Sequence, residues 1–157
     1  YKTDVFSSTT TSSWYDITGI ALTLSSVGSN SHKAIGNFGF AWGTHTSDTV
    51  NAFRIRKTID GGSNWTVLPN HVHGGTGGGA ANFQSQTVGL RSMLDSNGGN
   101  YTNLPFYDTA IGTTGNVTYQ MQGYRVQSGT FYINRTSSDS TTYGRGSANF
   151  WVMEVKA

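Results

Sequence analysis

The amino-acid composition leaves little room for α-helix. Gly, Ser, Thr and Asn account for 73 of the 157 residues, and these types favour turns, caps or strands over helix interiors. Glutamate, a strong helix former, occurs once, as Glu154. The chain nevertheless carries 8 Phe, 8 Tyr and 4 Trp, which are large enough to build a core. We therefore predict an ordered all-β domain.

Apolar residues that alternate with polar ones predict the strands. Between residues 33 and 42 the apolar positions are Ala34, Phe38, Phe40 and Trp42. In residues 53–59 the expected apolar face is Phe53, Ile55 and Ile59, with Arg54 and Arg56 on the opposite face. Strands are predicted over residues 17–24, 33–42, 53–59, 65–68, 83–90, 117–122, 131–134 and 148–155.

About eight or nine short strands joined by long loops predict two packed antiparallel sheets, most simply a jelly roll. We expect one domain over residues 1–157, because a chain of this length fits one domain. No internal repeat of 20–50 residues indicates a solenoid or propeller. The sequence begins at Tyr1, so it is expected to be a mature form, a fragment or the C-terminal part of a longer protein.

Charge and cysteine content exclude several kinds of function. The chain has no Cys, which excludes disulfides, zinc–thiolate sites and thiol catalysis. The net charge is +2, and Arg54, Arg56 and Lys57 form the only basic cluster, so we expect no nucleic-acid partner. No apolar run approaches the roughly 20 residues of a membrane-spanning helix, so no membrane insertion is expected.

Two groups of short motifs lie towards the ends of the chain. The first comprises residues 2–7 (KTDVFS), 15–20 (YDITGI) and 31–35 (SHKAI). The second comprises residues 106–108 (FYD), 115–122 (GNVTYQMQ), 132–135 (YINR), 143–147 (YGRGS) and 152–155 (VMEV). Together these motifs resemble the fibre or knob domain of tailed phages, especially those of cyanobacteria. The glycine-rich segment 71–81 departs from that pattern.

The resemblance implies a virion surface protein without enzymatic activity. It also implies a homotrimer with a jelly-roll fold in the manner of C1q and tumour-necrosis-factor domains, placed on a fibre, the capsid or the neck. Expected partners are other copies of the chain, other virion proteins and a glycan or protein of the host surface. The alternatives are a capsid decoration protein, a free carbohydrate-binding β-sandwich module, or a small secreted hydrolase.

The last predicted strand, residues 148–155, is apolar on both faces. Trp151 and Met153 alternate with Phe150 and Val152, and a strand of this kind is usually covered on both sides. We predict that one of these two pairs covers a subunit interface.

Glu154 lies in the same predicted strand, among apolar neighbours. Burying an unpaired carboxylate costs several kcal/mol, so Glu154 should have a cationic partner. The candidates for this structural ion pair are Arg135 and Arg145.

Attachment specificity is expected in loops at one end of the sandwich, because loops vary while the sheets hold them in place. The longest candidates are residues 43–50, 71–81 and 95–103. Individual candidates are Trp65, His71, His73, Asn97 and Asn100. His71 and His73 are read as exposed loop residues, with the alternative that three such pairs around a trimer axis bind an octahedral metal ion.

Catalysis and cofactor binding are not expected. The eight acidic residues lie mostly beside turn formers, where aspartate commonly bonds its own backbone. The sequence has no G-x-S-x-G motif, and no Lys-Ser/Thr follows the glycine-rich segment as a phosphate-binding loop requires. We therefore expect a structural or binding protein with no cofactor.

Overall fold

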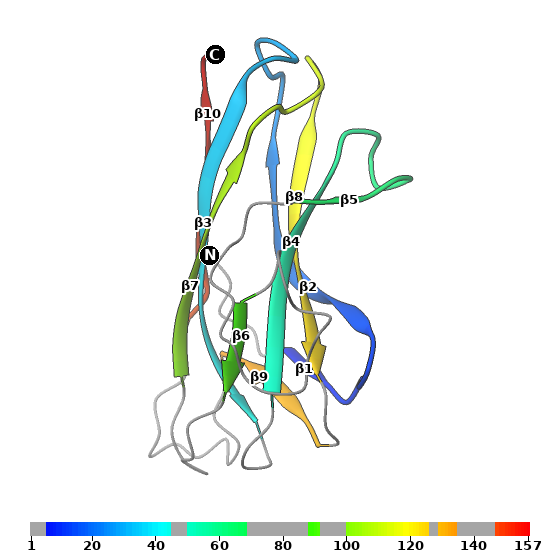
Figure 1. Cartoon of the computed structure of the whole chain (residues 1–157), viewed down its shortest axis with the longest axis vertical. Coiled ribbons are helices and arrows are strands. Elements are labelled where there is room, and N and C mark those ends of the chain that lie inside the picture. The colour runs from blue at the N-terminus through cyan, green and yellow to red at the C-terminus, as the bar shows by residue number, and fades with distance from the viewer. Residues whose placement is uncertain (1–5, 45–49, 69–87, 92–99, 126–128, 135–146) are drawn as a thin grey trace.

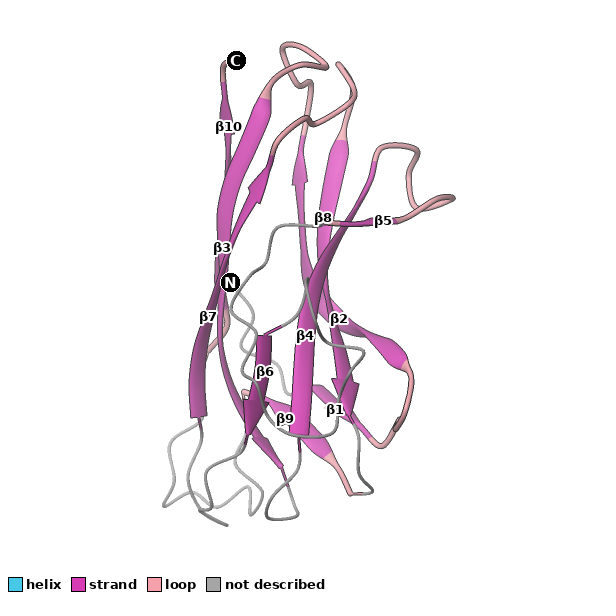
Figure 2. Ribbon diagram, viewed as in Figure 1, coloured by secondary structure: helices cyan, strands magenta, loops and turns pink. Residues whose placement is uncertain are grey.

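The computed structural model describes residues 6–44, 50–68, 88–91, 100–125, 129–134 and 147–157, and within these the chain forms ten strands and no helix. Figures 1 and 2 show the strands running mostly along the long axis of the molecule. The strands are β1 (Phe6–Ser8), β2 (Trp14–Leu24), β3 (Lys33–Thr44), β4 (Val50–Thr58), β5 (Thr66–Val67), β6 (Val88–Arg91), β7 (Asn100–Asp108), β8 (Val117–Arg125), β9 (Phe131–Ile133) and β10 (Asn149–Val155).

The strands form two antiparallel sheets. In the first sheet β3 pairs with β7 along one edge and with β10 and then β9 along the other, and β1 pairs with β9. In the second sheet β8 lies between β2 and β4, and the far edge of β4 pairs with β5 and β6. In Figure 1, β10, β3 and β7 lie on the left and β8, β4 and β5 on the right.

This strand order is that of a jelly roll. β9 and β10 pair with the same edge of β3, and β5 and β6 pair with the same edge of β4, so each of these two pairs occupies one position in its sheet. The strand orders are then β7-β3-β9/β10-β1 and β2-β8-β4-β5/β6. The chain passes between the sheets from β1 to β2, β3 and β4, and again from β6 to β7 and β8, as in two interlocked Greek keys. The predicted all-β sandwich is confirmed.

An aromatic cluster fills the space between the sheets. Phe40 and Trp42 on β3 meet Phe53 on β4, and Phe131 on β9 contacts both Trp42 and Phe53. The closest pair is Phe40 and Phe53, whose ring centroids lie 4.8 Å apart in an edge-to-face arrangement. All four side chains are buried, as the alternation in the sequence predicted for Phe40, Trp42 and Phe53.

A bulge in β2 places two isoleucines on the same side. The register between β2 and β8 shifts between Asp16 and Ala21, and Gly19 within this stretch has a φ of 81°. Strict alternation would send Ile17 and Ile20 to opposite faces, yet both are buried. The extra residues of the bulge, with glycine in a left-handed conformation, turn both side chains into the core.

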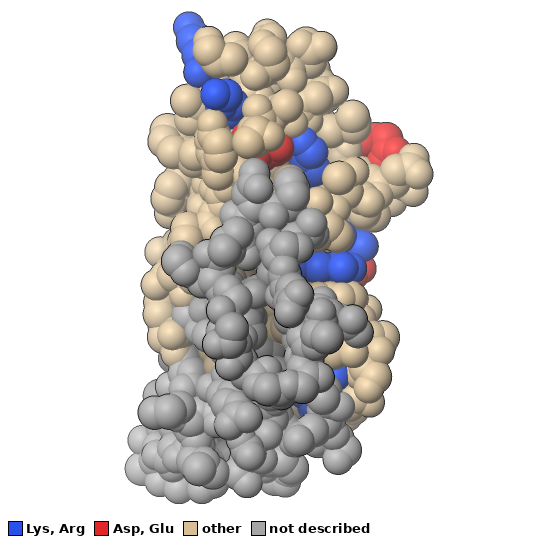
Figure 3. All heavy atoms as spheres, in the orientation of Figure 1, with Lys and Arg blue, Asp and Glu red and all other residues tan. Residues whose placement is uncertain are grey.

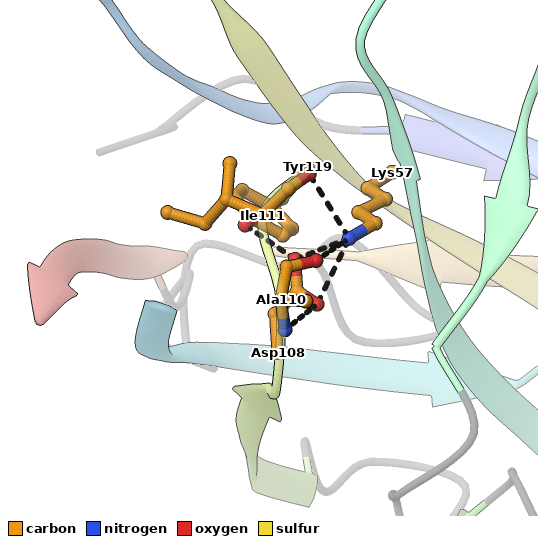
Figure 4. A network of polar contacts seen from close by, with 5 residues as sticks. All are labelled: Lys57, Asp108, Ala110, Ile111 and Tyr119. Carbon is orange, nitrogen blue, oxygen red and sulfur yellow. Dashed lines mark hydrogen bonds and ion pairs between the residues drawn. The ribbon is translucent and has the colours of Figure 1, made fainter. Parts of the chain in front are cut away.

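A polar cluster joins the two sheets inside the sandwich, and we call it the inter-sheet clamp (Figure 4). Lys57 Nζ on β4 donates to both carboxylate oxygens of Asp108 at the end of β7, at 2.9 and 2.7 Å. The same ammonium donates to the carbonyl oxygens of Ala110 and Ile111, and Tyr119 Oη donates to Asp108 Oδ2 at 2.8 Å. Burial, and then the charge of Asp108, raise the pKa of Tyr119, so the phenol keeps its proton and remains a donor.

Two expectations about strand ends are wrong. Residues 95–103 were expected to form one loop, but Asn100–Asp108 is strand β7, and Asn100 pairs with Trp42 of β3. Ile59 was expected on the buried face of its strand, but β4 ends at Thr58 and the Ile59 side chain is 47% exposed. The turn at Asp60 begins one residue later, and Asp60 N bonds back to Thr58 Oγ1.

Candidate functional site

The outer face of the first sheet carries most of the exposed apolar side chains. Among the described residues, the exposed large hydrophobic side chains are Ile59, Tyr101, Tyr107, Trp151 and Met153, and all but Ile59 lie on this face. Trp151 is 48% exposed and Met153 51%. Monomeric soluble proteins rarely leave large apolar side chains gathered in one place. We call this surface the aromatic face.

Strand register makes the aromatic face continuous across three strands. Met153 on β10 lies opposite Ile35 on β3, which lies opposite Tyr107 on β7. In the neighbouring row, Trp151 lies opposite Asn37, and Asn37 opposite Pro105. Residues directly opposite each other in a sheet lie close enough for their side chains to contact. The six residues therefore form one patch.

The aromatic face is almost without charge. At the outward positions of β3, β7 and β10 that the structure describes, the single charged side chain is Lys33, at one end of β3. Asn37 and Asn103 bond to each other, with Asn37 Nδ2 donating to Asn103 Oδ1 at 3.0 Å. Contact with another copy through this face would therefore remove no charge from water except that of Lys33.

The structure separates the two pairs predicted in the last strand. Phe150 and Val152 point inward and pack against the core, with Phe150 stacked on Phe38 at 5.8 Å between ring centroids. Trp151 and Met153 point outward and belong to the aromatic face. The alternation predicted in the sequence is confirmed, and the exposed pair is Trp151 and Met153.

The predicted loop residues fall in different places. Trp65 lies just before β5, partly buried, with its ring beneath the guanidinium of Arg56. Asn100 begins strand β7, and His71, His73 and Asn97 lie outside the described residues. Among the residues that the structure does describe, no group of three or more His, Cys, Asp or Glu could hold a metal ion.

Glu154 lies at the end of the sandwich where β2 and β3 are joined. Its Oε1 accepts a hydrogen bond from the backbone N of Gly28 at 2.8 Å and contacts His32 Nδ1. The carboxylate is partly exposed, with 30% of its side-chain surface accessible. The predicted partners Arg135 and Arg145 lie outside the described residues, so that pairing stays a prediction.

We expect acid to destabilise the wild-type chain more than the Glu154→Gln variant. The hydrogen bond from His32, then that from Gly28, lowers the pKa of Glu154 below its ordinary 4.5. A carboxyl group whose pKa is lower in the folded chain stabilises the fold at pH values above its ordinary pKa. This stabilisation is lost as the pH falls through the pKa of the folded chain. Urea unfolding between about pH 6 and about pH 3 should show the gap between the two proteins closing. A constant gap would contradict the proposed role of the charge.

The outer face of the second sheet is polar and carries two arginine–tryptophan pairs. In the first pair, Arg54 Cζ on β4 lies 4.1 Å from the ring centroid of Trp14 on β2. Arg54 Nε donates to Gln122 Oε1 at 2.7 Å, and Gln122 Nε2 donates to Asp16 Oδ1 at 2.8 Å. Burial, then the charge of Arg56, lowers the pKa of Arg54, but a guanidinium remains charged at neutral pH.

In the second pair, Arg56 Cζ lies 4.0 Å from the ring centroid of Trp65. Arg56 donates to Gln120 Oε1 from Nε at 3.1 Å and from Nη2 at 2.6 Å, and Nη2 also pairs with Asp16 Oδ1 at 2.7 Å. We call these seven residues the arginine–tryptophan face: Trp14, Asp16, Arg54, Arg56, Trp65, Gln120 and Gln122. Figure 3 shows that charged groups occupy only small parts of the described surface in this view.

The sequence signal for this face was incomplete. Alternation in residues 53–59 placed Arg54 and Arg56 on the side away from the core, as observed. Their partners depend on register, because Arg54 lies opposite Gln122 and Arg56 opposite Gln120. These pairs are separated by more than sixty positions, so no local pattern identifies them.

Comparison with known proteins shows little similarity. No protein-family model matches the chain, and no curated protein sequence matches it. A chain in a solved structure described as "Structure of infectious bursal disease virus Gx strain" aligns with 12% sequence identity and a TM-score of 0.36. The alignment covers 99% of this chain and 34% of that one, so this chain spans about a third of its length. In the described part of the chain, no helix is long and apolar enough to cross a membrane.

Proposed function

We propose that this chain is a structural domain on the surface of a phage particle. In this proposal it assembles as a homotrimer through the aromatic face, and it takes part in host attachment without catalysis. The observation that carries the proposal is the uncharged patch around Trp151, Met153 and Tyr107, which lies on the outside of the sheet while the core is already filled. Contact between copies would remove these side chains from water, and each buried side chain of this size contributes about 1.5–3 kcal/mol.

The resemblance of the C-terminal motifs to phage fibre domains supports three copies and a virion surface location. The aromatic face also favours this reading over a free carbohydrate-binding module, which has no need to hide a patch on the outside of its sheet. The second sheet and the turns beside it then stay on the outside of the assembly.

Light scattering on the purified chain tests the assembly. At micromolar concentration we expect a mass about three times the 16.9 kDa of one chain. A mass of one chain would contradict the trimer.

Antibodies raised against the chain test the location, and we expect them to label intact particles in electron micrographs. Labelling confined to disrupted particles would contradict a surface position.

A further inference from the structure

The two guanidinium groups of the arginine–tryptophan face are held in place by side chains of the same face, and some of their N–H groups are not used in these contacts. Arg54 uses Nε, for Gln122, and Arg56 uses Nε and Nη2. Within the part of the chain that the structure describes, both terminal nitrogens of Arg54 and the Nη1 of Arg56 donate to no side chain. The Cζ of each guanidinium also lies over an indole ring, 4.1 Å from the Trp14 centroid for Arg54 and 4.0 Å from the Trp65 centroid for Arg56, and this contact limits its movement. A ligand would meet donors that are already oriented.

The charge of this face favours an anion. The face holds two guanidinium groups and one carboxylate, that of Asp16, which pairs with Arg56 and whose side chain is 49% exposed. Among the seven residues of the face this leaves one positive charge in excess. Guanidinium donors match carboxylate and sulfate oxygens in geometry, and such charge-assisted bonds are stronger than neutral ones.

The shape of the face favours a chain of sugars over a single anion. Arg54 and Arg56 are two positions apart on one strand, so their backbones lie about 7 Å apart. A polymer with repeated anionic groups can contact both arginines along the strand. Trp14 and Trp65 are both partly exposed and contact the two arginines, so they offer indole surface against which apolar sugar faces can pack. Gln120 is partly exposed and adds an amide group beside Arg56, whereas the buried Gln122 holds Arg54 in place.

We propose that the arginine–tryptophan face binds an acidic polysaccharide, in which sugar rings bear carboxylate or sulfate groups. This inference rests on the proposed function, because it assigns the attachment site and the class of surface glycan. The site lies on the second sheet, and the aromatic face lies on the outside of the first. Assembly through the aromatic face therefore leaves the binding site accessible in every copy, and weak single sites would add up by multivalency.

Titration calorimetry with the intact chain tests the proposal. The probes are polygalacturonate oligomers for carboxylates, dextran sulfate for sulfates and dextran for neutral sugar, with single-stranded DNA as an anion of another class. We expect one or both acidic glycans to bind, and dextran and DNA to bind more weakly. Arg54→Gln should weaken glycan binding about tenfold.

Of two further variants, one tests the site against general charge attraction and the other tests it against a merely structural role. Lys156→Gln removes one positive charge from an exposed position at the end of the chain, and it should leave glycan affinity unchanged. Asp16→Asn keeps an oxygen at Oδ1 for both of its bonds while removing the competing negative charge, so it should strengthen glycan binding a few-fold. A merely structural role of this cluster predicts no gain.

Several outcomes would overturn the proposal. These are no binding of either acidic glycan, equal binding of dextran, tighter binding of DNA, or the same loss in Lys156→Gln as in Arg54→Gln. Light scattering on the same samples keeps the two proposals apart. If the chain is a trimer that binds no acidic glycan, only the glycan-binding inference is contradicted. If it is a monomer that binds an acidic glycan, only the proposed trimer is contradicted.

Discussion

The Asp108→Asn variant should be destabilised by about 3–5 kcal/mol, because it leaves the ammonium of Lys57 buried without its counter-ion. Asparagine keeps the size of the side chain, so little of the loss comes from packing. Asp108 is only 5% exposed and Lys57 15%, so water screens the pair little. For a domain of this size the expected fall in Tm is roughly 6 to 20 °C. Calorimetry at neutral pH measures it.

Two comparisons test whether the loss belongs to the clamp. Asp16→Asn removes a carboxylate that is half exposed, and it should cost less than about 1 kcal/mol. The double variant Lys57→Met with Asp108→Asn should be more stable than the sum of the two single changes predicts, because neither charge is then left alone. Additive losses would show that the two residues act independently.

A charge at Met153 should abolish trimers without unfolding the chain, whereas a charge at the neighbouring Val152 should unfold it. Met153 points outward and is 51% exposed. The carboxylate of Met153→Asp is therefore in water in the isolated chain and loses water only in the assembly. Val152 packs against the core, so Val152→Asp places a carboxylate among apolar side chains of the same copy. For the first variant we expect a folded monomer whose Tm equals that of the wild-type chain at concentrations low enough to dissociate the wild-type trimer.

The adjacent positions act as controls for each other. Light scattering gives the assembly state of each variant, and thermal unfolding at low concentration gives the stability of the single chain. A Met153→Asp variant that remains trimeric would remove the aromatic face from the interface. A soluble, fully stable Val152→Asp variant would contradict the inward position of that side chain.

Local patterns in the sequence determined the all-β class and most of the strand faces. Alternation repeats every two residues, so a short segment such as residues 33–42 already shows that Phe38, Phe40 and Trp42 share a face. The same rule placed Arg54 and Arg56 outward and divided Phe150 and Val152 from Trp151 and Met153. These features need no knowledge of distant residues, because they depend only on the geometry of an extended chain.

Tertiary structure decided what each face meets. The first four residues of β7 were expected to lie in a loop because residues 95–103 are rich in turn formers, yet pairing with β3 extends the strand back to Asn100. Glu154 contacts His32 and Gly28, more than a hundred positions away, and the clamp joins Lys57 to Asp108 across the two sheets. Register between distant strands likewise gathers Tyr107, Ile35 and Met153 into one patch. Such pairings arise from the packing of the whole chain, because a strand's own residues specify which side is apolar but not which strand lies beside it.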